Sequence, residues 1–104
     1  MPIDRVEALK NLLAQNPGDN FVRYGLAQAL ASRGEYENAI AEYEQLLRMN
    51  PDYAAAYYHA GQALERLGRL DEARSIYQRG IEVTARLGDA HACSELQAVL
   101  DLLG

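Results

Sequence analysis

Apolar side chains recur three and four positions apart along nearly the whole chain, which is the spacing of one face of an α-helix. Between positions 20 and 33, for example, Val22, Leu26 and Leu30 lie four positions apart. The pattern is broken by single glycines and by two Asn-Pro pairs, residues that end helices. It predicts six helices, over residues 3–15, 20–33, 36–49, 54–67, 70–86 and 89–103.

The residue types also favour helices over strands. Sheets favour β-branched side chains, and the chain has only four valines, four isoleucines and one threonine. Alanine, leucine, glutamate, glutamine and arginine are abundant, and they lose little conformational entropy in a helix. Pro17 and Pro51 stand between predicted helices rather than inside them. We therefore expect an all-α fold.

The sequence repeats itself with a period of 34 residues. Seven positions of the first copy recur unchanged in the second: Tyr24/Tyr58, Gln28/Gln62, Ala29/Ala63, Leu30/Leu64, Gly34/Gly68, Ala39/Ala73 and Tyr43/Tyr77. Pro17 and Pro51 keep the same offset. Each copy contains two predicted helices. Small residues at positions 27, 61, 39 and 73 would let the two helices of a copy approach closely.

These positions resemble the tetratricopeptide repeat family, whose unit of about 34 residues is a helix-turn-helix. The two copies carry the family's pattern at Leu26, Ala27, Leu30, Gly34, Tyr36, Ala39, Tyr43 and Pro51, and at Tyr57, Ala60, Gly61, Leu64, Gly68, Leu70, Ala73 and Tyr77. The resemblance implies a short right-handed α-solenoid of six helices with capping helices at its ends. Arg23 and Gly80 depart from the pattern. Ala85 replaces the closing proline, which predicts a helix that continues to about Leu87.

The repeat register divides the chain, taken as a single domain 1–104, into four parts. Residues 3–16 correspond to the second helix of a unit whose first helix is missing. Two full units follow at 20–53 and 54–87. The apolar stripe of residues 88–104 is offset by 36 rather than 34 positions, so this segment is predicted to be a C-terminal capping helix. Repeat arrays need caps because a stacked unit otherwise leaves an apolar face exposed.

In the family that the chain resembles, the first helix of each unit lines a concave surface where extended peptides bind. The resemblance implies a peptide-binding face at Phe21, Tyr24, Gln28, Tyr58, His59, Gln62 and Glu65. Glutamine offers donors and acceptors to a peptide backbone, and tyrosine offers apolar area with a polar tip. Alternatively, Tyr24 and Tyr58 only pack between helices and the glutamines are solvated. We favour a non-enzymatic interaction module or scaffold that binds a short peptide or partner segment.

The charge of the chain limits the class of partner. Its formal net charge is -5, so nucleic acid, which needs a basic face, is not expected. Some tetratricopeptide repeats hold acidic peptide tails with lysine, arginine and asparagine, but tyrosine, glutamine and His59 occupy the matching positions here. A neutral or basic protein partner is therefore expected rather than an acidic one. The sequence shows no membrane span or secretory signal, which predicts a cytoplasmic protein without membrane contact.

No catalytic residue, metal site or cofactor is expected from the sequence. His91 and Cys93 lie two positions apart and therefore face different sides of a helix. Cys93 is the single cysteine, which excludes an internal disulfide, and it lies on an apolar stripe as a small packed residue. No glycine-rich phosphate loop or zinc-binding helix motif is present.

The N-terminal helix predicts a different class of function. Without a partner helix, it should leave Ile3, Val6, Leu9 and Leu13 incompletely covered. Exposed apolar patches often mark association sites. The alternative to peptide binding is therefore an assembly element that forms a symmetric homodimer through this helix. The competing interpretation is that the helix is amphipathic enough to act as a simple cap.

Overall fold

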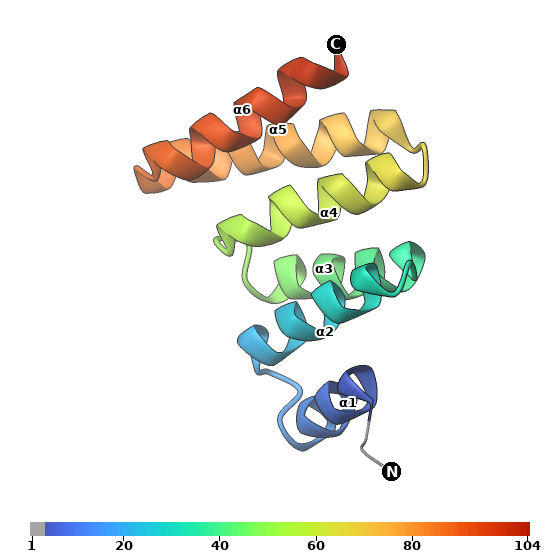
Figure 1. The fold of residues 1–104 in the computed structure, drawn as a ribbon. Helices are drawn as coiled ribbons and strands as arrows, with labels where there is room; N and C mark the ends of the chain where they lie inside the picture. The colour runs from blue at the N-terminus through green and yellow to red at the C-terminus, as the bar shows by residue number, and fades with distance from the viewer. Residues whose placement is uncertain (1–3) are drawn as a thin grey trace.

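Six α-helices follow one another along the chain and are stacked in sequence order (Figure 1). The computed structural model describes residues 4–104. The helices are α1 (Arg5–Gln15), α2 (Asn20–Ser32), α3 (Tyr36–Met49), α4 (Ala54–Arg66), α5 (Leu70–Leu87) and α6 (Ala90–Leu103). The stack measures 45 × 28 × 19 Å, with the two termini at opposite ends.

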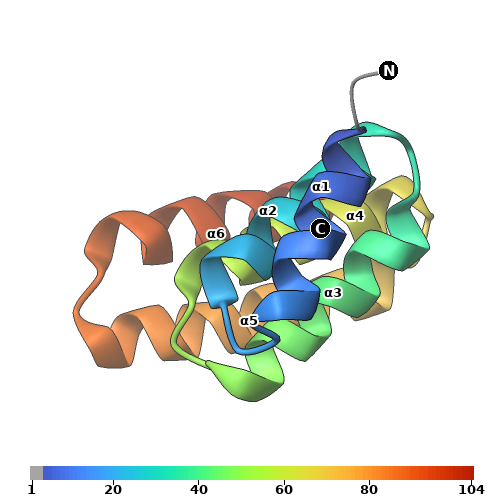
Figure 2. The same ribbon diagram turned by 90° about the horizontal axis from the view of Figure 1, so that it is seen from below.

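The helices form two layers when the stack is seen along its length (Figure 2). One layer contains α2, α4 and α6, and the other contains α3 and α5. Each helix packs on the next in sequence, and α4 also contacts α2 and α6 within its own layer. The predicted all-α solenoid is confirmed, and the described residues contain no strand.

Local signals in the sequence place the helix ends. The Asp19 carboxylate accepts a hydrogen bond from the Val22 amide at 3.1 Å and so caps the start of α2. Gly34 and Gly68 have φ values of +80° and +74° at the ends of α2 and α4. In this left-handed conformation the next amide bonds back to a carbonyl five residues earlier, which closes each helix end without strain. The hairpin turns therefore follow directly from the two glycines.

The core is a continuous row of large and small side chains between the layers. Tyr43, Tyr57 and Tyr77 are almost completely buried, as are Ala27, Ala39, Ala60 and Ala73. A Cβ atom added to Gly61 of α4 would lie only 2.0 Å from Cε1 of Tyr77. The ring of Tyr77 thus occupies the space that a side chain at position 61 would need.

The departures from the family pattern at Gly80 and Ala85 both lie in α5, and each has its own effect on that helix. Without a closing proline, α5 continues to Leu87, as predicted, and ends at Gly88. A Cβ atom at Gly80 would lie 2.7 Å from Cβ of Tyr57 and 2.9 Å from Cδ1 of Leu96. Glycine at this position allows α5 to approach both α4 and α6.

Arg23, where a large apolar residue is usual in the resembled family, is held by an ion pair. Its Nη1 lies 2.6 Å from Oε1 of Glu42 on α3, and its Nη2 donates to the Pro17 carbonyl at 3.0 Å. The Arg23 side chain is 13% exposed and the Glu42 side chain 27% exposed. The aliphatic part of Arg23 thus replaces an apolar side chain, and its charge is neutralised by α3.

Replacing Glu42 alone with leucine should lower the free energy of unfolding by about 1–2 kcal/mol, because Arg23 then stays largely buried without its counter-charge. Adding Arg23→Leu should restore most of this loss, because an apolar pair of similar volume avoids desolvating two charges. Urea unfolding of the two variants measures the difference. A double variant no more stable than Glu42→Leu would contradict this role of the ion pair.

The structure corrects the prediction for the N-terminal helix. Val6, with 2% of its surface exposed, and Leu13 are buried in the core, and Leu9 is half-buried against Gly25 of α2. The expectation that these residues remain uncovered is wrong for Val6 and Leu13, because the helix turns them toward α2. Ile3 lies outside the described residues. Leu12, at 50% exposed, is the large apolar residue that α1 presents to solvent.

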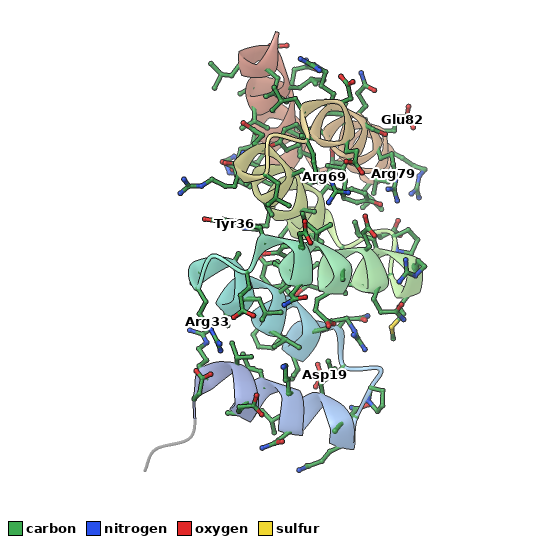
Figure 3. The ribbon with its side chains drawn as sticks, turned by 90° about the vertical axis from the view of Figure 1, so that its right-hand side faces the viewer. Asp19, Arg33, Tyr36, Arg69, Arg79 and Glu82 are labelled. Carbon is green, nitrogen blue, oxygen red and sulfur yellow. The ribbon has the colours of Figure 1, made fainter. Side chains whose placement is uncertain are left out.

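An ion pair also holds the start of α1 to the end of α2. Nη1 of Arg33 lies 2.6 Å from Oδ2 of Asp4, and Nε of Arg33 lies 2.8 Å from Oε2 of Glu35. Figure 3 shows Arg33 reaching from the end of α2 toward α1. The contact is half-exposed and adds little stability, but it agrees with α1 acting as a cap on α2.

Candidate functional site

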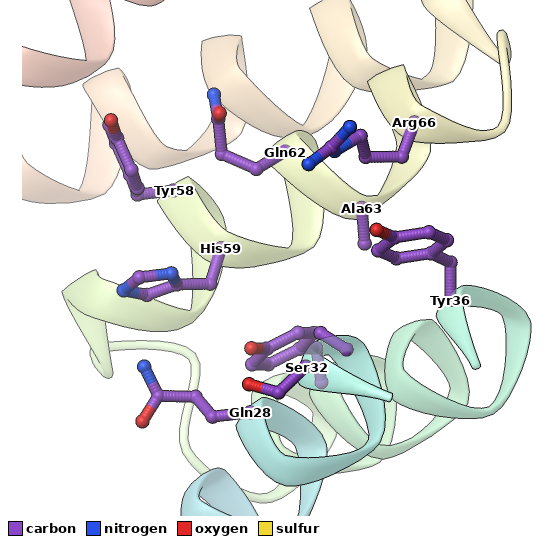
Figure 4. Close-up of a pocket in the computed structure, with 10 residues that line it drawn as sticks. Gln28, Ser32, Tyr36, Tyr58, His59, Gln62, Ala63 and Arg66 are labelled. Carbon is purple, nitrogen blue, oxygen red and sulfur yellow. The ribbon is translucent and has the colours of Figure 1, made fainter. Parts of the chain in front are cut away.

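A hollow of about 460 Å³ lies between α2, the start of α3, and α4 (Figure 4). Gln28 and Ser32 of α2 line one side, and His59 and Gln62 of α4 line the other. The remaining lining residues are Ala31, Tyr36, Tyr43, Tyr58, Ala63 and Arg66. The hollow is open to solvent and mixes amide, hydroxyl and aromatic groups. This is the mixture expected for contact with a peptide backbone and its side chains.

A second hollow of about 510 Å³ continues the surface between α4 and α6. It shares Tyr58 and His59 with the first hollow. Its other lining residues are Ala54, Ala55, Asp89, His91, Ala92, Glu95 and Leu96. The face formed by α2, α4 and α6 therefore carries two adjoining hollows with two shared side chains at their boundary. We call this surface the concave groove.

An aromatic cluster supports the groove from below. The ring of Tyr24 lies with its centroid 6.2 Å from Tyr43, 5.3 Å from Tyr53 and 5.7 Å from His59. The ring of His59 is stacked on Tyr43 at 6.4 Å and meets Tyr58 edge-on at 5.3 Å. Burial raises the pKa of Tyr24, and the neighbouring Tyr53 adds to this. Tyr24 is thus a packing residue that holds His59 in place, whereas Tyr58 faces both hollows.

A hydrogen-bond network joins the groove to the buried Tyr77 of α5. The Tyr77 hydroxyl donates to Oε2 of Glu65, and Nε2 of Gln62 donates to the Tyr77 hydroxyl at 2.6 Å. Nε2 of Gln62 also lies 3.2 Å from Oε2 of Glu65. Burial raises the pKa of Tyr77, and its bond to Glu65 raises it further, so the hydroxyl keeps its proton. Gln62 and Glu65 are therefore fixed by a core residue.

The structure brings four of the seven predicted binding residues together at the first hollow: Gln28, Tyr58, His59 and Gln62. Tyr24 lies behind them, and its hydroxyl accepts a hydrogen bond from Gln28 at 3.1 Å. Glu65 contacts the groove through its bond to Gln62. Phe21 is 77% exposed and lines neither hollow.

Sequence reasoning missed Arg66 and Tyr36. The Arg66 guanidinium lies 5.9 Å from the ring centroid of Tyr36 at the edge of the first hollow. Within residues 4–104, no carboxylate lies at ion-pair distance from Arg66. The residues singled out from the sequence include no fixed cation, and Arg66 adds one at the edge of the groove. The spacing could have shown this, because Arg66 follows Gln62 by four positions and so lies on the same helix face.

The two histidines differ in environment, which gives a prediction for pH dependence. Burial lowers the pKa of His59 below its unfolded value of 6.5, and the charge of Glu95 opposes part of this effect. As the pH falls below 6.5, the unfolded chain takes up the proton first, so stability present above pH 6.5 is lost on acidification. His59→Gln should therefore lose less stability than the wild type between about pH 7 and 5.

Urea unfolding at several pH values measures this loss. The control is Gln78→Ala, an exposed position on α5, and this variant should follow the wild-type profile. If the free energy of unfolding of His59→Gln changed with pH as that of the wild type does, His59 would not change its pKa on folding.

The other candidate chemical groups stay apart. Cys93 is half-buried, with Sγ 3.9 Å from the Ile81 carbonyl, and His91 pairs with Glu95 on α6. Residues 4–104 contain no group of three histidine, cysteine, aspartate or glutamate side chains that could share a metal ion. In the same range, no helix combines the length and apolar character needed to cross a membrane.

The chain is similar to known repeat proteins along most of its length. A sequence profile described as "Tetratricopeptide repeat" matches residues 6–46 and, in a second match, residues 24–90. A TPR repeat-containing protein of Pseudomonas aeruginosa is 27% identical over 95 residues, which are 91% of this chain and 90% of that protein.

Two solved structures show the same arrangement of helices. The solution structure of a tetratricopeptide repeat domain protein from Salinibacter ruber is 40% identical, with a TM-score of 0.79, and the match covers 85% of this chain and 89% of that one. The TPR2B domain of yeast Sti1, solved in a complex with pHsp70, has a TM-score of 0.87 at 18% identity, over 94% of this chain and 78% of that one.

Proposed function

Because the chain belongs to the tetratricopeptide repeat family, we propose that it is a non-enzymatic interaction module whose concave groove binds a short extended segment of a partner protein. The observation that carries this proposal is the pair of adjoining hollows across α2, α4 and α6, which meet at Tyr58 and His59. Tyrosine at the centre of a concave surface is a common anchor of binding energy. The complex of the structurally similar Sti1 domain with pHsp70 agrees with a protein ligand.

The groove also limits the charge of the segment that it would hold. Asp89 and Glu95 line the second hollow, while Arg66 stands at the far edge of the first. The lowered pKa of His59 leaves it uncharged at neutral pH, so it adds no cation to the groove. The net charge of -5 then favours encounter with a neutral or basic segment. An acidic residue of the ligand would fit only beside Arg66.

Selection from a library of random ten-residue peptides supplies a probe for this proposal. The selected peptide should bind Tyr58→Ala about tenfold or more weakly than the wild type, because truncating a central tyrosine removes buried contact area. Tyr24 is unsuitable for this test, because it packs on Tyr43, Tyr53 and His59 and its removal would disturb the fold.

The matched control is Gln78→Ala on α5, an exposed position that lines neither hollow. This variant should bind the peptide as the wild type does, with affinity measured by fluorescence anisotropy. Equal affinity of Tyr58→Ala and wild type, or a library that yields no binding peptide, would refute the groove as the binding site.

A further inference from the structure

The two hollows of the concave groove carry opposite fixed charges. We infer that together they select an extended segment with one basic and one acidic residue about three to five positions apart. The basic residue occupies the second hollow, beside Glu95, and the acidic residue lies at the edge of the first, beside Arg66. The inference deepens the proposed peptide-binding function and rests on it, because it names the charge pattern of the bound segment.

Arg66 supplies the positive end of the groove. Of the described residues that line the first hollow, Arg66 alone carries a fixed charge. Its guanidinium lies 5.9 Å from the ring centroid of Tyr36, and no carboxylate within residues 4–104 lies at ion-pair distance from it. A guanidinium can stay on an aromatic face while its N–H groups, which point outward in its plane, bind a carboxylate in a fork. Arg66 can therefore receive an acidic residue of a ligand.

The second hollow supplies the negative end. Asp89 and Glu95 line it, and within the described part of the chain neither has a lysine or arginine at ion-pair distance. Oδ1 of Asp89 accepts a hydrogen bond from the Ala92 amide at 3.0 Å, and Oε1 of Glu95 pairs with Nε2 of His91. Each carboxylate has a second oxygen that can accept from a cation.

Glu95 is the stronger of the two partners for a basic side chain. Asp89 caps the N-terminus of α6, where the positive end of the helix dipole offsets part of its charge. Glu95 follows His59 by 36 positions, the offset that relates α6 to α4. Burial lowers the pKa of His59 and the charge of Glu95 opposes part of this effect, which agrees with that closeness. Glu95 therefore stands near the boundary of the two hollows.

The walls of the second hollow suit a long basic side chain. Ala55, Ala92 and Leu96 are apolar, and Tyr58 adds an aromatic ring. Lysine and arginine lay their methylene stems on apolar surface and keep the charge at its edge. A cation near a tyrosine ring gains further attraction. The hollow thus offers surface to the stem of the side chain as well as carboxylates to its charged end.

The positions of the two charges set the spacing of the segment. α4 and α6 run in the same direction (Figure 1), and Tyr58 and Arg66 lie toward opposite ends of α4 (Figure 4). The seven positions from His59, beside Glu95, to Arg66 span roughly 10 Å along the helix axis, and the neighbouring helix lies about 10 Å to the side. An extended segment that crosses this diagonal of roughly 14 Å, at about 3.3 Å per residue, uses about four residues.

This separation also excludes segments of a single charge. Arg66 and Glu95 make no ion pair with each other, so the unoccupied groove keeps both charges. Two basic residues at this spacing would place one cation against Arg66, and two acidic residues would place one anion against Glu95. Specificity of this kind comes from the repulsion of the wrong ligand as well as from attraction of the right one.

The test exchanges the two charges of the groove. Arg66→Glu combined with Glu95→Lys keeps the net charge at -5, because the first substitution lowers it by two and the second raises it by two. The probe is the peptide selected on the wild type from the library of ten-residue peptides. It should bind the exchanged variant about tenfold or more weakly, because each of its charges then meets a like charge. The same peptide with its own two charges exchanged should prefer the exchanged variant to the wild type.

The matched control is Arg48→Glu combined with Glu82→Lys, which makes the same exchange at exposed positions of α3 and α5 that line neither hollow. This variant should bind both peptides as the wild type does. Circular dichroism of each variant shows that the helices are kept. Fluorescence anisotropy at about pH 8, where an ordinary histidine is uncharged, measures the affinities without a contribution from histidine charge.

Double-mutant cycles measure each contact separately. Replacing the acidic residue of the peptide with its amide should weaken binding to the wild type about two- to tenfold, the effect of one charged hydrogen bond. The same replacement should have no further effect on Arg66→Gln. Replacing the basic residue of the peptide with methionine should likewise weaken binding to the wild type, and should have a smaller effect on Glu95→Gln.

The outcomes separate the inference from the proposed function. Selected peptides without the paired charges would overturn the inference and leave the groove as the binding site. Equal affinity of the selected peptide for the wild type and the exchanged variant would do the same. A library that yields no binding peptide would overturn the proposed function and, with it, the inference.

Discussion

Replacing Gly61 with alanine should lower the free energy of unfolding by about 1–3 kcal/mol, the usual effect of overpacking a core. In an exposed helix the same change would raise stability by about 1 kcal/mol. The added Cβ would lie 2.0 Å from Cε1 and 2.5 Å from Cζ of Tyr77, far inside van der Waals contact. The Tyr77 ring is fully buried between α4 and α5, so it has no free space into which to move.

Gly25→Ala is the matched control, because Gly25 lies within α2 as Gly61 lies within α4. A Cβ at Gly25 would meet Cδ2 of Leu9 at 3.7 Å, which is an ordinary contact. This variant should be more stable than the wild type by up to about 1 kcal/mol. Urea unfolding of both variants gives the comparison. A stabilised Gly61→Ala would show that Tyr77 does not occupy the space beside position 61.

The helix boundaries and the order in which the helices stack could be predicted from the sequence. The helix boundaries follow from local features such as the Asp19 cap and the glycines at 34 and 68, whose effects do not depend on distant residues. The 34-residue period then places every helix pair in the same relation. The layers and the extended α5 were therefore predictable without coordinates.

The candidate site was only partly predictable, because its contacts join residues from different helices. The period showed that Tyr24 and Tyr58 are equivalent in register, but their surroundings differ: Tyr24 lies among Tyr43, Tyr53 and His59, whereas Tyr58 lines both hollows. A repeat pattern describes what the units share. It carries no information about differences that depend on the neighbouring unit.

The network of Tyr77 shows the same limit. In the sequence, Tyr77 is a core residue with the same role as Tyr43, and Glu65 is a candidate for the binding face with no visible connection to Tyr77. The hydrogen bond between Tyr77 and Glu65 depends on the missing side chain at Gly61, which lets α4 and α5 approach closely. It also depends on a carboxylate that only the second unit has. Two substitutions distinguish the units here, Gly61 in place of Ala27 and Glu65 in place of Ala31, and only the structure shows that they act together.

The alternative function, self-assembly through α1, depends on which residues of that helix face solvent. Replacing Val6 with glutamate should lower the free energy of unfolding by about 2–4 kcal/mol, because a carboxylate without a partner would enter the core. Val6 is 2% exposed, so the glutamate could reach water only if α1 leaves α2. Replacing Leu12 with glutamate should change stability by less than about 0.5 kcal/mol, since Leu12 is half-exposed.

Val6→Glu and Leu12→Glu together distinguish an effect on folding from an effect on assembly. Val6→Glu alone would not distinguish them. Loss of a dimer in Val6→Glu would not identify α1 as the interface, because this substitution detaches α1 itself from α2. If a homodimer forms through α1, Leu12→Glu should make it monomeric in sedimentation equilibrium at micromolar concentration while the helical circular dichroism stays at the wild-type level. A wild-type chain that sediments as a monomer would exclude assembly through α1 and leave the helix as a cap on α2. Equal destabilisation by the two substitutions would instead contradict the orientation of α1, since only one of the two side chains faces the core.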